Sequence, residues 1–288
     1  MHIKFFFNIK LSQEIKFFKF FPNFLSSKIP EIVGNKCKNI NMIKHGSVWK
    51  TTSKSRNQKL INWVNQYLQH TKKRRTLLEL GASSGISVFP GLKKKVKIKK
   101  YFLTDLHLNH YYKKAFSFTL LFSNKKDRIP FMAFNKMLIF YSDSKTINFI
   151  PSIISYLIRI ILSIICLRFN KKTLFLLDDK IIECQIKYPI VFKKYNLFST
   201  WRYSDIDLII ASNLLNNSYF SKKLMNSIVS NIFNMLKVND IIIIGDNKKK
   251  DKKDKISVFK KTYNKFVLIQ NKGGKVESHD FFLKFLLK

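Results

Sequence analysis

The sequence is poor in acidic residues, cysteine and glycine. Of its 288 residues, 17 are Asp or Glu and 54 are Lys or Arg, which gives a formal net charge of +37. The 46% of apolar residues are enough for a sizeable core, so a disordered chain is excluded despite the charge. No period recurs along the chain, which excludes collagen, solenoids and coiled coils. The length fits one large domain, or one domain with additions.

Arginine is also scarce, since only seven of the basic residues are Arg. A basic surface attracts nucleic acid, but nucleic-acid sites prefer the arginine fork. The abundant residues Lys, Asn, Ile and Phe have AT-rich codons, so we attribute the charge mainly to genome base composition. Anionic partners such as RNA or lipid headgroups stay open as the alternative source.

Cysteine is limited to Cys37, Cys166 and Cys184, with no C-x-x-C pair. This spacing excludes a zinc ribbon and a disulfide framework, and it is typical of a reduced, cytoplasmic protein. Charges such as Glu14 and Lys16 interrupt the apolar N-terminus, so we expect no cleaved signal peptide. A helix that lies on a membrane surface stays open, which would make the protein membrane-associated at its surface.

Apolar runs and helical periods alternate along the chain from residue 58 onward. Helices are predicted from the patterns QKLINWVNQYLQH and SKKLMNSIVSNIFNML, and strands from TLLEL, KKYFLTDL, YPIVFKKYNLF, DIDLIIASN and DIIIIGDN. Strands that alternate with helices predict an α/β fold, here a doubly wound, Rossmann-like, mostly parallel sheet of seven strands. The tail from residue 256 holds strand-like runs with no helix between them, which predicts an antiparallel edge.

A glycine-rich turn follows the first strand, which ends near Glu79. The turn is Gly81-Ala82-Ser83-Ser84-Gly85, and we expect a helix after it. In this geometry backbone N–H groups approach a ligand closely, and a side chain at Gly81 would block that approach. The serine-nucleophile interpretation fails, because no Asp/His pair follows in the required order. Asp105 ends the second strand, where a carboxylate can accept hydrogen bonds from ribose hydroxyls.

Together these features resemble the class I S-adenosylmethionine-dependent methyltransferases over residues 58–246. The resemblance implies that the chain binds S-adenosyl-L-methionine and transfers its methyl group. It implies these cofactor contacts: Glu79, Gly81, Ala82, Ser83 and Gly85 at the methionine moiety, Asp105 at the ribose, Asn196 and Leu197 at the adenine, and Asn213 at the reacting centre. Ser83 replaces the usual middle glycine, which is tolerable if its φ stays negative, and Asn196 replaces the usual acid.

The resemblance names no catalytic base, and three residues are candidates by position only: Asn213, Tyr219 and His110. His107 and His110 are expected on a helix after the second strand, and we predict that no metal is needed. The acceptor is expected to be a small molecule, a lipid or a glycan. Two alternatives stay open: a basic RNA-binding or RNA-methylating protein on the same fold, and a catalytically degenerate interaction subunit.

The spacing of the strands predicts three parts: an N-terminal extension over 1–57, a methyltransferase-like domain over 58–288, and within it an insertion over 116–185. The insertion is expected to be helical and to cap the domain. Its segment 150–168 is apolar and nearly long enough to span a bilayer. However, a span there would put two neighbouring strands on opposite sides of the membrane. We therefore predict a cap, with attachment to a membrane surface as the alternative.

Overall fold

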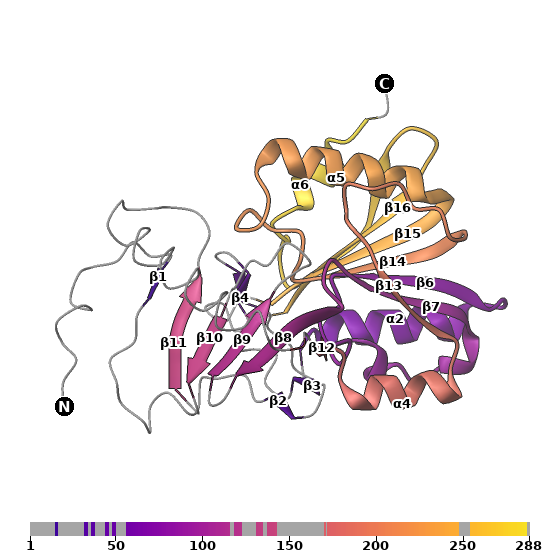
Figure 1. Cartoon of the computed structure of the whole chain (residues 1–288). Coiled ribbons are helices and arrows are strands. Elements are labelled where there is room, and N and C mark those ends of the chain that lie inside the picture. Colours follow the sequence, from indigo (N-terminus) through magenta and orange to yellow (C-terminus); the bar gives the residue numbers. More distant parts are fainter. Residues whose placement is uncertain are drawn as a thin grey trace. The chain divides into compact units, whose positions relative to one another are not determined.

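The computed structural model describes residues 56–115, 118–122, 131–134, 137–142, 170, 172–247 and 254–286, together with several two-residue strands nearer the N-terminus. The chain divides into two compact units, which are drawn in Figure 1 and described here separately. Unit 1 comprises Met1–Thr51 and Asn109–Leu176, and unit 2 comprises Thr52–Leu108 and Leu177–Lys288.

Unit 2 is built on a seven-stranded sheet, as the sequence predicts. In spatial order its strands are β13 (Ile190–Lys194), β7 (Ile98–Asp105), β6 (Arg75–Leu80), β14 (Ile206–Ser212), β15 (Leu236–Asp246), β16 (Lys255–Lys261) and β17 (Phe266–Lys272). The first five are mutually parallel, while β16 is antiparallel to both of its neighbours. The prediction of a mostly parallel sheet with an antiparallel edge is therefore confirmed.

Helices cover both faces of this sheet (Figure 1), so that it has a core on each side. One face is covered by α2 (Gln58–His70) and α4 (Asp179–Lys187), and the other by α5 (Lys222–Met235) and α6 (His279–Leu283). The 3.6-residue period of α2 turns one apolar stripe inward. The buried residues of that stripe are those that the sequence predicts: Leu60, Ile61, Val64 and Leu68.

The helix expected directly after the glycine turn is absent, and that prediction is wrong. Two short 3-10 turns, η3 (Phe89–Gly91) and η4 (Lys95–Lys97), fill the connection instead. Pro90 and Gly91 disfavour an α-helix in so short a segment, and the lysines that follow repel one another. Helix α4, which follows β12 in the sequence, packs beside the turn through Ile181.

Unit 1 contains an eight-stranded sheet whose centre is an antiparallel meander. Its longer strands are β8 (Asn109–Ala115), β9 (Phe118–Phe122), β10 (Phe131–Phe134), β11 (Met137–Ser142) and β12 (Lys172–Phe175). Three two-residue strands join them in the order β1-β11-β10-β9-β8-β12-β3-β2: β1 (Ile15–Lys16), β2 (Ile32–Val33) and β3 (Lys36–Cys37). A separate ribbon pairs β4 (Lys44–His45) with β5 (Val48–Trp49).

The prediction of a helical insertion is wrong for residues 118–175 where they are described, which form strands β9 to β12, whereas Asp179–Gln185 of the insertion belong to helix α4. Runs such as FTLLF and MLIFYS are short, rich in aromatic and branched side chains, and separated by polar turn residues, which favours strands. The segment 150–168 lies outside the described residues, so its helix and its role as a cap stay predictions. Among the residues that are described, no helix is long and apolar enough to cross a membrane.

Candidate functional site

The residues singled out in the sequence meet at the carboxyl ends of the parallel strands of unit 2. The glycine turn follows β6, Asp105 ends β7, Asn196 and Leu197 follow β13, and Asn213 follows β14. The carboxyl ends of parallel strands lie at one edge of a sheet, which we call the carboxyl edge. Open α/β sheets bind their ligands at this edge.

The glycine turn has an unusual backbone, because several of its residues lie in the left-handed region. The φ angle is +62° at Gly81, +58° at Ser83 and +79° at Gly85. The condition under which serine is expected to be tolerable at this position, a negative φ, is therefore not met. A serine in this region is strained relative to glycine, and it is kept there by the contacts of the turn.

Neighbouring side chains explain why glycine occupies the two ends of the turn. A Cβ atom at Gly81 would lie 2.8 Å from Leu214 Cδ1, and one at Gly85 would lie 2.5 Å from Leu103 Cδ1. Both glycines are thus required by their φ angle and by packing within the protein. The sequence interpretation, in which Gly81 only leaves room for a ligand, missed this second reason.

Asp105 anchors the turn to the end of β7. The backbone N–H of Ser83 donates to Asp105 Oδ2 over 2.8 Å, and that of His107 donates to Oδ1 over 2.9 Å. The backbone N–H of Ala82 also donates to the carbonyl of Thr104 over 2.8 Å. The carboxylate, which is 8% exposed, is therefore part of the scaffold of the turn.

Glu79 is a buried carboxyl group directly below the turn. It is 1% exposed, and the hydroxyl of Tyr101 donates to its Oε2 over 2.6 Å. Burial raises the pKa of Glu79 to about 8, while the Tyr101 hydrogen bond opposes this and the nearby Asp105 charge adds to it. Glu79 is therefore mostly protonated and neutral at pH 7.

Two serine hydroxyls of the turn have no partner among the described residues. The hydroxyl oxygens of Ser83 and Ser84 are buried and form no hydrogen bond there. The backbone of Ser84 is occupied, since its carbonyl accepts the N–H of Asp178 at the start of α4 over 3.0 Å. Buried hydroxyls are nearly always paired, so these two call for a polar partner, which a water molecule or a ligand can supply.

Asn213, predicted to face the reacting centre, connects three segments of unit 2. Its amide donates to Asn57 Oδ1 over 3.2 Å and to Ser212 Oγ over 3.4 Å, and its Oδ1 accepts the N–H of Asn247 over 2.6 Å. Asn57 also donates to the Ser212 hydroxyl. The Asn213 side chain is thus occupied in holding the ends of β14 and β15 and the start of α2.

We expect Asn213→Ala to lower the free energy of unfolding by about 1 to 3 kcal/mol, because buried partners lose their hydrogen bonds. Alanine also tolerates the residue's φ of +52° poorly. Asn213→Gly separates the two effects, since glycine accepts this φ and still lacks the amide. Urea unfolding of wild type, Asn213→Ala and Asn213→Gly measures the loss of the hydrogen bonds and the backbone effect. Equal stability of wild type and both variants would contradict the role of this side chain.

The remaining predicted residues are placed less centrally. Asn196 is exposed and accepts the N–H of Phe198 over 3.1 Å, while Leu197 packs against the core of unit 2. Tyr219 is half-buried, and burial raises the pKa of its phenol, opposed by the nearby charge of Arg56. Its phenol is therefore protonated at neutral pH.

His110 lies in unit 1, on strand β8 opposite Leu174, and it is fully buried. The prediction that His107 and His110 share a helix is wrong, because strand β8 begins at Asn109. Sequence reasoning also missed Tyr101 and Asn57. The position of Asn57 directly before a helix was the available signal for the latter, since polar residues there often organise a helix start.

Comparisons with known proteins give structural matches only. No family model and no curated protein matches the chain. Solved structures that match include the N-methyltransferase NodS from Bradyrhizobium japonicum in complex with S-adenosyl-L-homocysteine, with 11% identity over 68% of this chain and a TM-score of 0.34. PKMT2 from Rickettsia typhi in complex with AdoHcy has 12% identity over 62% and a TM-score of 0.31. A protein-L-isoaspartate O-methyltransferase has 12% identity over 86% and a TM-score of 0.38.

The matched parts cover 63%, 22% and 51% of these three proteins, so the chain spans less than two thirds of each. These identities and TM-scores are low. We therefore take the fold of unit 2 from its own strand order, and we argue its function from its own residues.

Proposed function

We propose that unit 2 binds S-adenosyl-L-methionine at the carboxyl edge and transfers its methyl group to an acceptor. The observation that carries the proposal is the left-handed turn, held by Asp105, with the partnerless hydroxyls of Ser83 and Ser84 buried inside it. This combination of a fixed turn and unpaired polar groups fits a polar ligand at the end of β6.

The residues present fit the parts of this cofactor. The hydroxyls of Ser83 and Ser84 would bind the methionine moiety, with Glu79 near its positive charges. Asp105 ends β7 beside the turn and accepts one N–H on each oxygen, and this carboxylate would lie near the ribose hydroxyls. Asn196 and Leu197 would flank the adenine. The cofactor would supply an electrophilic methyl group on a sulfonium.

The contribution of the protein to this reaction is mainly to align the reactants and to exclude water. The Asn213 amide is occupied in structural hydrogen bonds, so it is not proposed as a reacting group. Tyr219, whose phenol stays protonated at neutral pH, could donate a hydrogen bond but would be a poor base. We therefore assign no catalytic base and leave the acceptor class unspecified.

Isothermal titration of the full-length protein with S-adenosyl-L-methionine tests the proposal. Gly81→Val should abolish binding, because any side chain at φ +62° beside Leu214 distorts the turn. Asp105→Ala should weaken binding by about 1.5 to 3 kcal/mol, as expected for charge-assisted hydrogen bonds. Ser83→Gly should weaken binding by about two- to tenfold, because it removes the Ser83 hydroxyl while glycine keeps the same backbone.

Asp280→Ala is the matched control, because it also removes a carboxylate, but from an exposed position on α6. Thermal unfolding of each variant shows whether it is folded under the conditions of the titration. Folded Gly81→Val and Asp105→Ala proteins with wild-type affinity, or a wild-type protein that does not bind, would refute the proposal. Binding without transfer to any acceptor would favour the interaction-subunit alternative.

A further inference from the structure

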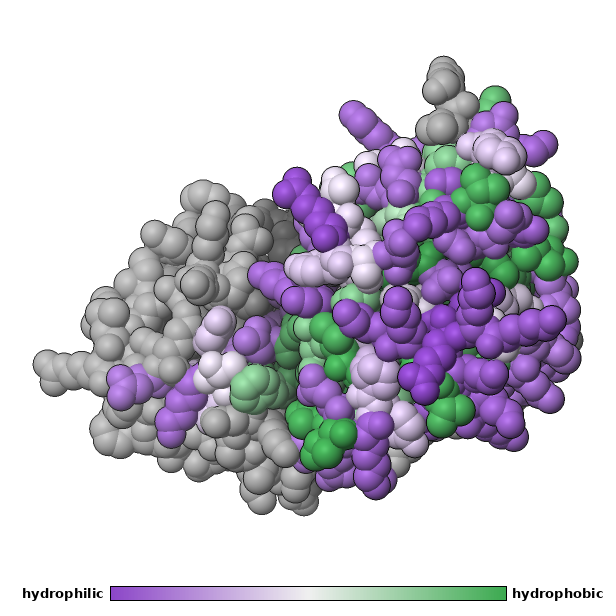
Figure 2. Space-filling view, turned by 90° about the vertical axis from the view of Figure 1, so that its right-hand side faces the viewer, coloured by the Kyte–Doolittle hydropathy of each residue, from purple (hydrophilic) through white to green (hydrophobic). Residues whose placement is uncertain are grey.

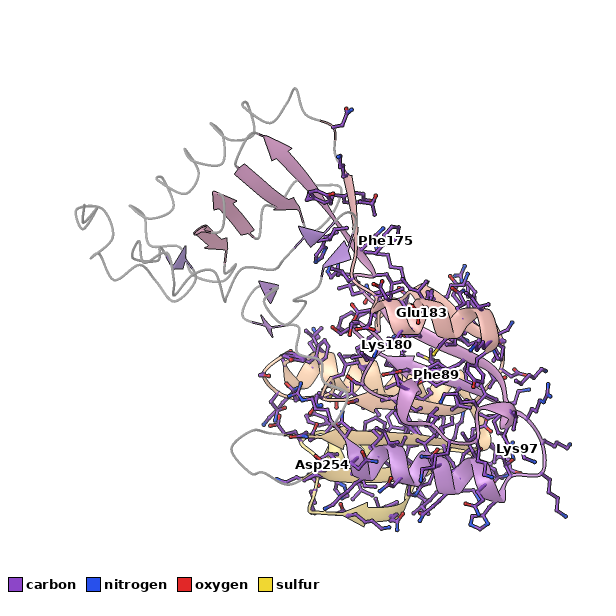
Figure 3. All side chains as sticks on the ribbon, turned by 90° about the horizontal axis from the view of Figure 1, so that it is seen from below. Phe89, Lys97, Phe175, Lys180, Glu183 and Asp254 are labelled. Atoms are coloured by element: carbon purple, nitrogen blue, oxygen red, sulfur yellow. The ribbon has the colours of Figure 1, made fainter. Side chains whose placement is uncertain are left out.

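The opposite edge of the sheet, where the parallel strands begin, carries a cluster of basic side chains. They lie in the connections that lead into β6, β7 and β13. We call this surface the basic edge, and it consists of Lys72, Lys73, Arg74, Lys93, Lys94, Lys97 and Lys187. Figure 3 shows Lys97 at one end of unit 2 and Asp254 at the other, so the basic edge lies away from the carboxyl edge.

Strand register places the three connections next to one another. Arg75 pairs with Ile98, so Arg74 and Lys97 precede paired positions. The ammonium group of Lys95 lies 5.6 Å from the ring centre of Tyr188, which joins the second connection to the third. The basic edge is therefore one continuous surface. Figure 2 looks onto this end of unit 2, where hydrophilic side chains gather.

Acidic residues are nearly absent from this part of the chain. Between Thr52 and Thr104 the sole acid is Glu79, which is buried at the other edge. Glu183, which precedes Lys187 by one turn of α4, is the exposed acid nearest to the basic edge in sequence. Base composition explains how many lysines the chain has, but it does not explain this separation of the two charge signs.

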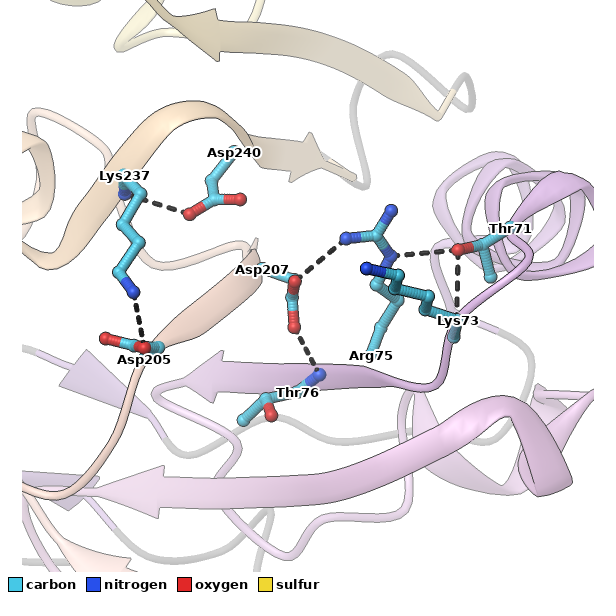
Figure 4. Close-up of polar contacts among 8 residues, drawn as sticks. All are labelled: Thr71, Lys73, Arg75, Thr76, Asp205, Asp207, Lys237 and Asp240. Carbon is cyan, nitrogen blue, oxygen red and sulfur yellow. Dashed lines mark hydrogen bonds and ion pairs between the residues drawn. The ribbon is translucent and has the colours of Figure 1, made fainter.

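The acids at the same edge of the sheet lie farther along, directly before β14, on β14 and on β15, and they already have partners (Figure 4). Asp207 accepts from the Arg75 guanidinium over 2.9 Å and from the backbone N–H of Thr76 over 2.7 Å. Asp205 pairs with the ammonium of Lys237. These acids therefore compensate Arg75 and Lys237, and no described acid forms an ion pair with the basic edge.

Two aliphatic side chains protrude among the lysines. Val96 is 69% exposed in η4, and Ile186 is 86% exposed at the end of α4. Nucleic-acid surfaces favour arginine and stacking aromatic rings, whereas the basic edge has one arginine and no exposed aromatic ring of its own. Lysines around protruding aliphatic groups suit a negatively charged bilayer surface, where charge attracts and short apolar groups enter the headgroup region.

We propose that the basic edge docks unit 2 onto an anionic lipid surface, with Val96 and Ile186 inserted among the headgroups. This inference does not depend on the proposed methyl transfer. In this orientation the carboxyl edge faces away from the bilayer, toward the solution.

Vesicle co-sedimentation of the full-length protein tests this inference. The vesicles contain phosphatidylcholine with about 30% phosphatidylserine, and pure phosphatidylcholine is the neutral reference. The edge variant replaces five lysines by glutamine: Lys72, Lys73, Lys93, Lys94 and Lys97. Since each basic group near such a surface contributes about fivefold, or ~1 kcal/mol, we expect partitioning to fall at least tenfold.

The control variant has the same net charge but changes lysines elsewhere on unit 2. It replaces five exposed residues near the carboxyl edge by glutamine: Lys59, Lys180, Lys222, Lys223 and Lys272. Its partitioning should stay within about twofold of wild type, because these groups lie away from the docked surface. An equal loss in both variants would show a non-specific charge effect and overturn the proposal.

Two further measurements test whether Val96 and Ile186 insert into the bilayer, and whether the basic edge binds nucleic acid instead of lipid. Val96→Ser with Ile186→Ser should weaken partitioning several-fold at unchanged charge, and unaltered partitioning would contradict insertion. Single-stranded RNA is titrated against wild type and the edge variant in parallel. If the edge variant loses RNA binding while its vesicle binding is unchanged, the basic edge binds nucleic acid and the lipid proposal is wrong.

Discussion

Wild type is expected to lose roughly 4 to 5 kcal/mol of its free energy of unfolding through Glu79 as pH rises from 4.5 to about 8. Glu79→Gln should not show this pH-dependent loss, because glutamine does not titrate. The folded state raises the pKa of this carboxyl group to about 8 from its usual 4.5. Between these values the unfolded chain has lost the proton while the folded protein keeps it. This contribution to stability is therefore fully present below pH 4.5 and is lost as pH rises to about 8.

Urea unfolding between pH 4 and about 9 measures this difference as a change in the pH dependence of stability. Glu183→Gln is the matched control, because Glu183 is exposed on α4. A smaller slope of the same sign should remain in Glu79→Gln, since burial raises the pKa of Asp240 to about 6. If Glu79→Gln and wild type have the same pH dependence, Glu79 is not the buried neutral acid described above.

The second large effect is expected at the other end of the glycine turn, where Gly85→Val should lower the free energy of unfolding by about 2 to 5 kcal/mol. The φ angle of +79° disfavours a branched residue by about 1 to 2 kcal/mol. Crowding adds to this, because a Cβ atom would lie 2.5 Å from Leu103 Cδ1 and 3.2 Å from Ile181 Cγ2.

Gly274→Val is the control for the backbone part of this effect. Gly274 also has a positive φ, of +104°, but a Cβ atom there would meet Lys255 Cε at an ordinary 3.6 Å. The difference between the two variants in chemical denaturation therefore measures the crowding by Leu103 and Ile181. A Gly85→Val protein no less stable than Gly274→Val would contradict the packing described for the turn.

The sheet of unit 2 could be predicted from the sequence because buried parallel strands are encoded locally. Runs such as Leu208–Ala211 and Ile242–Ile244 are continuous and apolar, and each is followed within two residues by a polar residue at the carboxyl edge. The period of α2 likewise identified its buried stripe. These features depend on the residue types within one short segment, so no distant contact can alter them easily.

The details of the site could not be predicted in this way, because they depend on distant partners. The left-handed φ of Ser83 goes with a hydrogen bond to Asp105, and the role of Asn213 depends on Asn57 and Asn247. The buried neutral state of Glu79 likewise depends on Tyr101, which is on another strand. The strands of unit 1 were missed because a long apolar segment dominated the interpretation of the insertion.

The packing of α4 beside Gly85 has a consequence for how the protein folds. The helix that covers the glycine turn is encoded after the longer strands of unit 1, and not directly after β6. The contact between Ile181 and Gly85 therefore closes a long stretch of chain, and closing it costs entropy before the contact contributes to stability. We expect the local pairing of β6 with β7 to precede the complete turn, so that a nascent chain acquires the fully packed glycine turn only after α4 has been synthesised.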